Sequence, residues 1–202
     1  MKRFFGTWII ALIALTAAAS TARPPAQPDT VPIVRSPAAV RLTGPDNKPA
    51  SLHFSDSSQY MAIVFLSPEC PLCQNYTLVL NRLSDQYKGR ITLYGVIPGK
   101  AYSAGELEKF RTGYHLRFDL LTDRDFELVK LLKATTTPQV FLLSRQNEIL
   151  YAGLIDNWAA SLGVQRTVVT RHYLAAAIDA ALNHLPIATR TTIPVGCLIN
   201  TH

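Results

Sequence analysis

Stretches of continuous apolar residues alternate along this chain with stretches whose apolar residues recur every three or four positions. Residues 61–66 are apolar throughout and have the length of a strand, so they predict a strand buried on both faces of a central sheet. The segment that follows has the periodicity of an amphipathic helix. Its apolar face consists of Cys73, Tyr76, Leu80, Leu83 and Tyr87. This helix is expected to end at Lys88-Gly89 and to pack on the sheet.

The later segments continue the alternation of strands and helices. Strands are predicted at 91–97 and 118–121, and a hairpin at 139–143 and 149–153. A capping-box pattern from Ser103 to Glu106 opens one helix, and another helix is expected to begin at Asp123. A last helix has Leu174, Ile178, Ala181 and Leu182 on one face. Residues 156–169 have weak periodicity and are interpreted as an insertion or long loop.

Length and composition fit one folded domain. The chain has 202 residues, of which 48% are hydrophobic and 17% charged, enough for a core that does not depend on disulfides. We place the domain at 39–185 and a C-terminal tail without clear periodicity at 186–202. The domain is expected to begin with a hairpin whose strands carry Val40 and Leu42, then Leu52 and Phe54.

The first residues have the pattern of an export signal. Lys2 and Arg3 precede an uncharged apolar segment, residues 4–19, which is followed by small residues suited to a signal peptidase. We expect residues 1–22 to be a cleaved signal peptide; an uncleaved membrane anchor is the alternative. Residues 23–38 are rich in proline and predict an extended linker. The folded part is therefore expected outside the cytoplasm, in the bacterial periplasm, with membrane contact only if the signal stays attached.

Charge and histidine distribution argue against two function classes. The net charge of +6 is spread along the chain, and no basic cluster is interleaved with aromatic residues, which argues against nucleic-acid binding. The five histidines show no ligand spacing, and no second Cys-x-x-Cys is present to complete a zinc site. We therefore expect neither a metal nor another cofactor.

Cys70-Pro71-Leu72-Cys73 stands where the strand at 61–66 gives way to the following helix. A helix N-terminus favours thiolate over thiol, and the thiolate attacks disulfides, peroxides and metals. Two other interpretations stay open, namely a permanently closed structural disulfide and half of a zinc site. Glu69 precedes the pair, and a carboxylate beside a thiolate opposes its formation, so Glu69 is a candidate modulating residue.

The order of these elements resembles the thioredoxin fold. A strand is followed by Cys-x-x-Cys at a helix start, by crossover units, by Thr137-Pro138 directly before a strand, and by a hairpin and a final helix. The resemblance covers most of residues 39–185. It implies an α/β fold of three layers, with a central mixed sheet, helices on both faces and an N-terminal β-hairpin extension.

A closer resemblance is to exported bacterial redoxin-domain proteins, which are related to alkyl hydroperoxide reductase and thiol-specific antioxidant (AhpC/TSA) and are TlpA-like. It is carried by Glu69 to Cys73, by the segment 151–156, and by Gly196-Cys197-Leu198-Ile199. This resemblance implies a thiol:disulfide oxidoreductase that acts on protein disulfides or dithiols and is served by a redox partner protein. Cys70 would attack and stay exposed, Cys73 would be more sheltered and resolve, and Thr137 with a cis Pro138 would bind an extended substrate segment.

Two other functions and the third cysteine remain open. A peroxidase is suggested by Ser67-x-x-Cys70, but Ile63 stands where peroxiredoxins have proline. A copper chaperone of the Sco type uses the same fold, with the cysteine spacing C-x-x-x-C, which this chain lacks. Cys197 has three possible fates: it resolves Cys70, links to another chain, or stays a buried inert residue.

Overall fold

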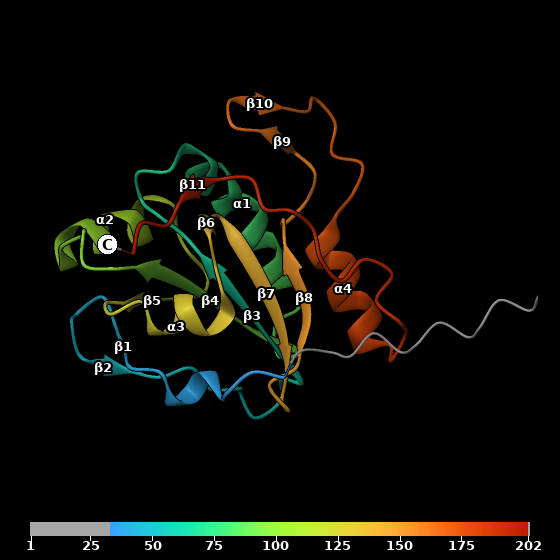
Figure 1. Ribbon diagram of the computed structural model, residues 1–202, viewed down its shortest axis with the longest axis horizontal. Helices are drawn as coiled ribbons and strands as arrows, with labels where there is room; N and C mark the ends of the chain where they lie inside the picture. The colour runs from blue at the N-terminus through green and yellow to red at the C-terminus, as the bar shows by residue number, and fades with distance from the viewer. Residues whose placement is uncertain (1–32, 202) are drawn as a thin grey trace, which may run out of the picture. The chain divides into compact units, whose positions relative to one another are not determined.

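The computed structural model describes residues 33–201 (Figure 1). The predicted signal peptide, residues 1–22, and the linker residues up to 32 lie outside the described part, so both stay predictions. Within residues 33–201, no helix has the length and apolar character needed to cross a membrane.

A mixed sheet of seven strands forms the centre of the fold, in the order β2-β1-β5-β4-β3-β7-β8. Its middle strand β4 runs parallel to both of its neighbours, β3 and β5, because each of these connections crosses over through a helix. On its other side β3 pairs antiparallel with β7, which forms a hairpin with β8. The strand bounds are β3 Tyr60–Phe65, β4 Ile91–Pro98, β5 Asp119–Asp123, β7 Gln139–Ser144 and β8 Ile149–Gly153. This arrangement confirms the predicted α/β fold with a mixed sheet.

Both faces of the sheet are covered, as the apolar run in β3 predicted. Ala62 and Val64 point into a core shared with the helices α1 (Pro71–Gln86), α2 (Ala104–Gly113) and α4 (Tyr173–Leu182). Met61, Ile63 and Phe65 point into the opposite core, which is shared with α3 (Glu127–Leu132) and the N-terminal segment. Because successive residues of a strand face opposite sides, a strand buried twice must be apolar throughout.

The N-terminal hairpin is shorter than predicted. Its strands are β1 (Leu42–Thr43) and β2 (Pro49–Ala50), and β1 joins the sheet antiparallel to β5. Leu52 and Phe54, expected in the second strand, lie beyond it; Leu52 is nevertheless completely buried, so packing rather than strand pairing accounts for its apolar character. Before the hairpin, the 3-10 turn η1 (Pro37–Ala39) and a bridge between Ile33 and Glu148 tie the N-terminal segment to the domain.

The helix expected to begin at Asp123 begins four residues later. Asp123 is instead the last residue of β5, and its Oδ2 accepts the backbone N–H of Val129 at 2.8 Å. Phe126 stands between them in the left-handed region, with φ of 56°, and the helix α3 starts at Glu127. The carboxylate thus satisfies an N–H of the first helical turn from outside the helix. The capping box of α2, by contrast, is present as predicted: Ser103 and Glu106 each bond the other's backbone N–H.

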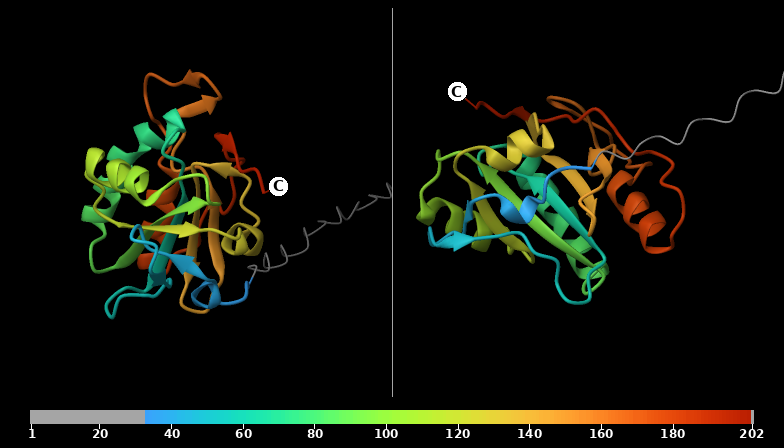
Figure 2. Two further views of the ribbon diagram at one scale, coloured as in Figure 1. Left: turned by 90° about the vertical axis from the view of Figure 1, so that its left-hand side faces the viewer. Right: turned by 60° about the horizontal axis from the view of Figure 1, so that its bottom comes forward.

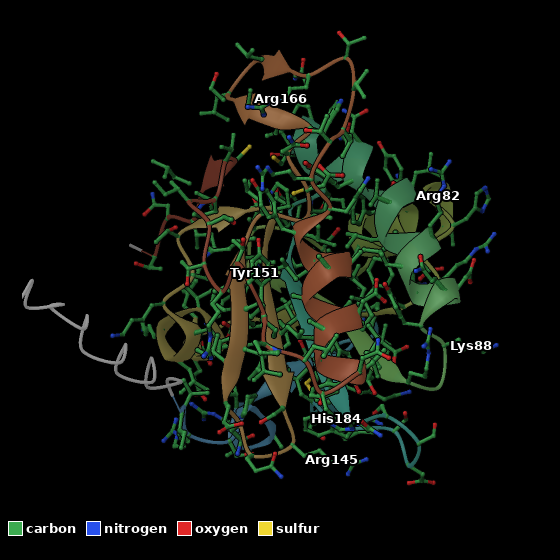
Figure 3. All side chains as sticks on the ribbon, turned by 90° about the vertical axis from the view of Figure 1, so that its right-hand side faces the viewer. Arg82, Lys88, Arg145, Tyr151, Arg166 and His184 are labelled. Atoms are coloured by element: carbon green, nitrogen blue, oxygen red, sulfur yellow. The ribbon has the colours of Figure 1, made fainter. Side chains whose placement is uncertain are left out.

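Two segments without clear periodicity form short strand pairs. Residues 156–169, expected as a long loop, contain the hairpin of β9 (Ala159–Ser161) and β10 (Val164–Gln165), which projects from the domain and ends near Arg166 (Figure 3). The tail contributes β11 (Cys197–Leu198), which pairs antiparallel with β6 (Thr136–Thr137). Figure 2 shows this tail strand from two further sides. Strands of two or three residues have too little alternation to be detected in the sequence.

Candidate active site

Cys70 occupies the position directly before helix α1. Its backbone is extended, with φ of −77° and ψ of 115°, while its carbonyl already accepts the N–H of Gln74 at 3.1 Å. Pro71 is the first helical residue, where its fixed φ suits the helix and its missing N–H costs no hydrogen bond. The partial positive charge of the helix N-terminus therefore lies next to the Cys70 sulfur, as the sequence predicted.

Cys73 lies in the first turn of α1 and is completely buried. Its Sγ accepts the backbone N–H of Ser67 at 3.4 Å. The Ser67 hydroxyl in turn lies 2.7 Å from the hydroxyl of Tyr102, so the loop between β3 and α1 is held from two sides. Burial, followed by the hydrogen bond to Cys70, raises the pKa of the Cys73 thiol well above its ordinary value.

Thr137 and Pro138 face the cysteines from the strand pair on the other side. The peptide bond between them is cis, as expected for a proline that precedes a strand in this fold. The Cys70 Sγ lies 3.3 Å from the carbonyl oxygen of Thr137. This contact suits the thiol form of Cys70, which donates to the carbonyl, and it ties the first cysteine to the segment predicted to bind a substrate.

Cys197 is brought to the same place by the tail. In the pairing of β11 with β6, Cys197 lies opposite Thr137 and Leu198 lies opposite Thr136. The Cys197 Sγ lies 2.6 Å from the Cys70 Sγ. All three cysteines are free thiols in this structure, and they come from a helix start and a tail strand that are far apart in the sequence. Figure 1 shows β11 beside β6, at the end of the sheet where α1 begins.

The three sulfur atoms differ strongly in acidity. The pKa of Cys70 falls to about 4, because Cys73 donates a hydrogen bond to the thiolate; burial opposes this, and a hydrogen bond from Cys197 adds to it. The pKa of Cys197 rises to about 11 through burial and its contact with Cys70. One thiolate is thus stabilised by two neighbouring thiols, and the thiolate is the nucleophilic form of cysteine.

Cys70 is not exposed, contrary to what the resemblance implied. Only 2% of its surface is accessible, because the tail lies over it. Glu69, the candidate modulating residue, is exposed to solvent beside it. Among residues 33–201, the site therefore combines Cys70, Cys73, Thr137, Pro138 and Cys197, with the tail lying against Cys70.

A buried polar cluster attaches the β9–β10 insertion to α1. The Asp156 carboxylate accepts the hydroxyl of Tyr76 at 2.6 Å and the backbone N–H of Trp158 at 2.8 Å. Trp158 packs edge-on against Tyr76, with 5.5 Å between ring centroids. The pKa of Tyr76 is raised by burial and by this carboxylate. Trp158 thus has the packing role that aromatic residues commonly fill.

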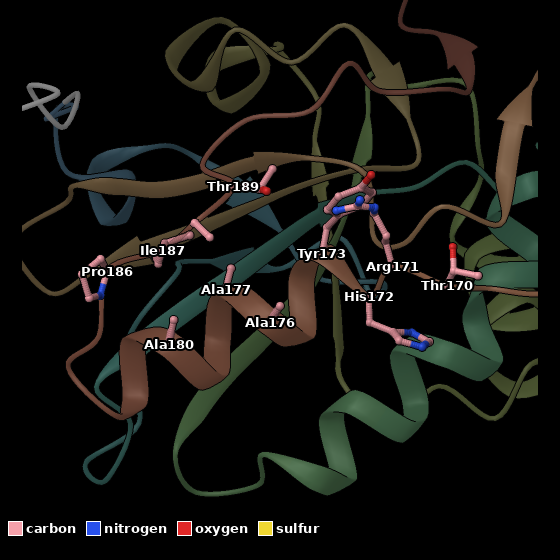
Figure 4. Close-up of a pocket in the computed structure, with 11 residues that line it drawn as sticks. Thr170, Arg171, His172, Tyr173, Ala176, Ala177, Ala180, Pro186, Ile187 and Thr189 are labelled. Atoms are coloured by element: carbon pink, nitrogen blue, oxygen red, sulfur yellow. The ribbon is translucent and has the colours of Figure 1, made fainter. Parts of the chain in front are cut away.

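A pocket of about 390 Å³ lies between α4 and the first part of the tail (Figure 4). Its lining includes His172, Tyr173 and Ile187, and none of the three cysteines contributes to it. Within the described part of the chain, no group of three or more His, Cys, Asp or Glu side chains is arranged to hold a metal ion.

Tyr102 was missed from the sequence, and Gly196 was noted there only as part of the tail motif, without its contact to Thr137. Tyr102 lies in a loop before α2, and nothing in its sequence context indicates that its hydroxyl reaches Ser67. Gly196 precedes Cys197, and a Cβ built there would lie 2.2 Å from the Thr137 carbonyl oxygen, so only glycine fits. The isolated Gly-Cys pair in the tail was the only available sign of this close approach.

Comparison with known proteins agrees with this geometry. The sequence profile of the AhpC/TSA family matches residues 36–152, more than half of the chain. No curated protein matches significantly.

Solved structures share the fold. An uncharacterized conserved protein from Geobacillus kaustophilus is 23% identical, with a TM-score of 0.72, and covers 85% of this chain and 93% of its own. The hypothetical protein SMc02350 from Sinorhizobium meliloti is 22% identical, with a TM-score of 0.71. The match covers 85% of this chain and 95% of that protein. A secreted disulfide oxidoreductase from Mycobacterium tuberculosis, described as homologous to DsbE of E. coli, is 17% identical, with a TM-score of 0.51. The match covers 69% of this chain and 94% of that protein. With its profile match and its mixed sheet, the chain belongs to the AhpC/TSA family of thioredoxin-like redoxins.

Proposed function

We propose that this protein is a thiol:disulfide oxidoreductase that acts on protein disulfides, with Cys70 as the nucleophile and Cys73 as the resolving cysteine. The observation that carries the proposal is a thiolate with a pKa of about 4 at the start of α1, beside a buried thiol and a cis-proline segment. The family membership supports it, as does the name of the similar protein from Mycobacterium tuberculosis.

The reaction proceeds by two thiol–disulfide exchanges. The Cys70 thiolate attacks one sulfur of a substrate disulfide, so that a bond forms between Cys70 and the substrate while the other substrate sulfur leaves as a thiolate. Cys73 then loses its proton and attacks the Cys70 sulfur, which releases the second substrate thiolate and forms the Cys70–Cys73 disulfide. The substrate gains two electrons and the protein loses two. A redox partner protein reverses the change in the protein.

Trapping of the intermediate tests this proposal. The substrate is a synthetic peptide with one internal disulfide, and the protein carries Cys197→Ser so that no third thiol interferes. Adding Cys73→Ser to it should accumulate a mixed disulfide of the peptide with Cys70, detected by mass spectrometry. Adding Cys70→Ser instead should abolish both the adduct and the reduction of the peptide. Reduction that persists without Cys70 contradicts the proposal.

A peroxidase is the second candidate, favoured by the match to a family named after alkyl hydroperoxide reductase. We rank it lower because Ile63 stands where peroxiredoxins have proline. In addition, the hydrogen bonds that lower the pKa of Cys70 come from two thiols, Cys73 and Cys197, which suits thiol–disulfide exchange. Consumption of hydrogen peroxide by the reduced protein, measured against free cysteine, separates the two. A rate well above that of free cysteine that is lost in Cys70→Ser favours the peroxidase.

We propose that the reaction takes place after export, in the periplasm. The support is the sequence pattern of residues 1–22. Fractionation of bacterial cells that express the full chain, followed by mass determination of the N-terminus, tests both the location and the cleavage.

A further inference from the structure

The tail is attached to the domain in two separate places. The first attachment is next to β8, where Ala152 bonds the backbone of Arg190 and Thr192. The Thr192 hydroxyl also accepts the N–H of Leu154 and lies within hydrogen-bond distance of the hydroxyl of Tyr151, both at 2.8 Å. Ile193, the next residue, is 86% exposed and leads to the second attachment at β6. The tail thus has a fixed part that ends at Thr192 and a separate part that carries Cys197.

The second attachment has the form of strand addition. β11 is the strand partner of β6, and the Ile199 N–H continues the pairing by donating to the carbonyl of Thr135 at 2.9 Å. Extended peptides bind other proteins in this way, by offering backbone groups to an unpaired strand edge. If the tail left, the edge at 135–137 would offer its free backbone groups to another strand beside the Cys70 sulfur.

The side chains of the tail fit this edge in a defined pattern. Gly196 passes so close to the Thr137 carbonyl that an added Cβ would lie 2.2 Å from its oxygen and 2.6 Å from its carbon. Val195 and Ile199 are partly buried against the two cores, whereas Leu198 is 83% exposed. A strand bound in this register therefore needs glycine before the cysteine and apolar residues two positions to either side of it.

From these contacts we infer that β11 is a tethered substitute for the substrate: it occupies the edge at Thr135–Thr137 where a protein substrate binds, and that substrate is an extended segment with a Gly-Cys pair. The inference rests on the proposed function, which supplies the disulfide chemistry. Substrate and tail exclude each other, because both need the same backbone groups of β6 and the same face of the Cys70 sulfur.

The tail also provides a second disulfide without an added oxidant. Once a substrate has been reduced and has left, Cys197 loses its proton and attacks the Cys70 sulfur of the Cys70–Cys73 disulfide. A Cys70–Cys197 bond forms and Cys73 leaves as a thiolate, which takes up a proton. The number of electrons in the protein does not change, since one disulfide replaces the other. The covalently closed tail then keeps further substrates out.

The occupancy of the edge is tested by alkylation of Cys70 in the fully reduced protein. Gly196→Ala introduces the clashing Cβ and should release β11, so the rate of alkylation by iodoacetamide should rise about tenfold or more. Gly105→Ala is the matched control, because a Cβ at Gly105 meets nothing within 4 Å, and its rate should stay at that of the unchanged protein. Circular dichroism verifies that both variants fold. Equal rates in all three proteins overturn the inference.

The substrate pattern is tested with two peptides that form disulfide-linked dimers, Val-Gly-Cys-Leu-Ile and Val-Ala-Cys-Leu-Ile. The reduced protein should reduce the glycine peptide with a kcat/KM about tenfold higher or more. Equal kcat/KM values overturn the substrate pattern and leave the proposed function standing. If neither peptide nor a generic small disulfide is reduced, the proposed function fails and the substrate pattern with it, while the alkylation experiment still decides whether the tail covers Cys70.

Discussion

Cys197 lies opposite Thr137 in the β11–β6 pairing, and this register puts its sulfur 2.6 Å from that of Cys70. The carbonyl of the same Thr137 is 3.3 Å from the Cys70 sulfur. The edge of β6 therefore places both the Cys197 sulfur and the Thr137 carbonyl next to the Cys70 sulfur, which is the nucleophile. The alignment depends on backbone pairing, which any extended chain of suitable sequence is able to make.

The ionisation of Cys70 should control its reactivity at unusually low pH. Because its pKa is about 4, the thiolate predominates above that pH and is lost below it. Alkylation of the reduced protein by iodoacetamide should therefore reach half its maximal rate near pH 4 and stay constant through neutral pH. Cys73→Ala removes the largest cause of the low pKa and should move the midpoint upward. A midpoint near pH 8 or 9 in the unchanged protein contradicts this assignment.

The Thr192 hydroxyl should determine how readily the Cys70–Cys197 disulfide forms. Thr192→Val keeps the shape of the side chain but removes the hydroxyl that accepts from Leu154 and contacts Tyr151. The fixed part of the tail then loosens and the effective concentration of Cys197 at Cys70 falls. We expect a severalfold smaller fraction of Cys70–Cys197 disulfide in a glutathione redox buffer, measured by peptide mapping. Thr189→Val, also in the tail, is the control and should leave the fraction unchanged.

The buried hydroxyl of Tyr76 should contribute more to stability than that of Tyr60. Tyr76→Phe deprives the buried Asp156 carboxylate of a donor, which should lower the free energy of unfolding by about 1–3 kcal/mol. Tyr60→Phe removes a bond to the neutral carbonyl of Ala181 and should cost about 0.5–1.5 kcal/mol. Urea unfolding monitored by circular dichroism measures both. A smaller loss for Tyr76→Phe than for Tyr60→Phe would show that Asp156 does not depend on this donor.

The capping box of α2 gives a prediction away from the cysteines. Ser103→Ala removes the side chain that accepts the N–H of Glu106, and the free energy of unfolding should fall by about 1 kcal/mol. The reduction of a peptide disulfide should be unaffected. Thr112→Ala, near the other end of the same helix, serves as the comparison and should change stability less. If both variants lose the same free energy of unfolding, the N-cap contributes no more to stability than an ordinary side chain of this helix.

The fold was largely predictable because its central elements have strong periodicity. The run at 61–66, the helical face from Cys73 to Tyr87 and the hairpin at 139–153 each appear as expected. The start of α3 was wrong because Asp123 bonds the first helical turn from the end of β5. An N-cap residue directly precedes its helix, whereas here Phe126, in the left-handed conformation, lies between Asp123 and the start of α3. The sequence does not indicate that conformation.

The candidate site was predicted in its parts and not in its assembly. Cys70, Cys73 and Pro138 were recognised from local sequence, but the position of Cys197 depends on pairing between residues far apart in the chain. β11 contains two residues, too few to show alternation. The expected exposure of Cys70 was wrong for the same reason: the tail that covers it is joined by backbone hydrogen bonds, and these carry little sequence signal.

The attachment at Thr192 keeps the tail strand β11 close to β6, so a substrate has to compete with β11 for the same edge. The affinity that a substrate needs is therefore set by the tail. A segment tethered a few residues away is present at its site at an effective concentration on the order of millimolar. A free partner must match that advantage through its own affinity, so cysteine segments that bind weakly do not displace the tail and do not reach the Cys70 sulfur. A tail that pairs more tightly with β6 would let fewer proteins reach Cys70, and a tail that pairs more weakly would let more of them reach it. The chemistry of the Cys70 sulfur would be the same in both cases.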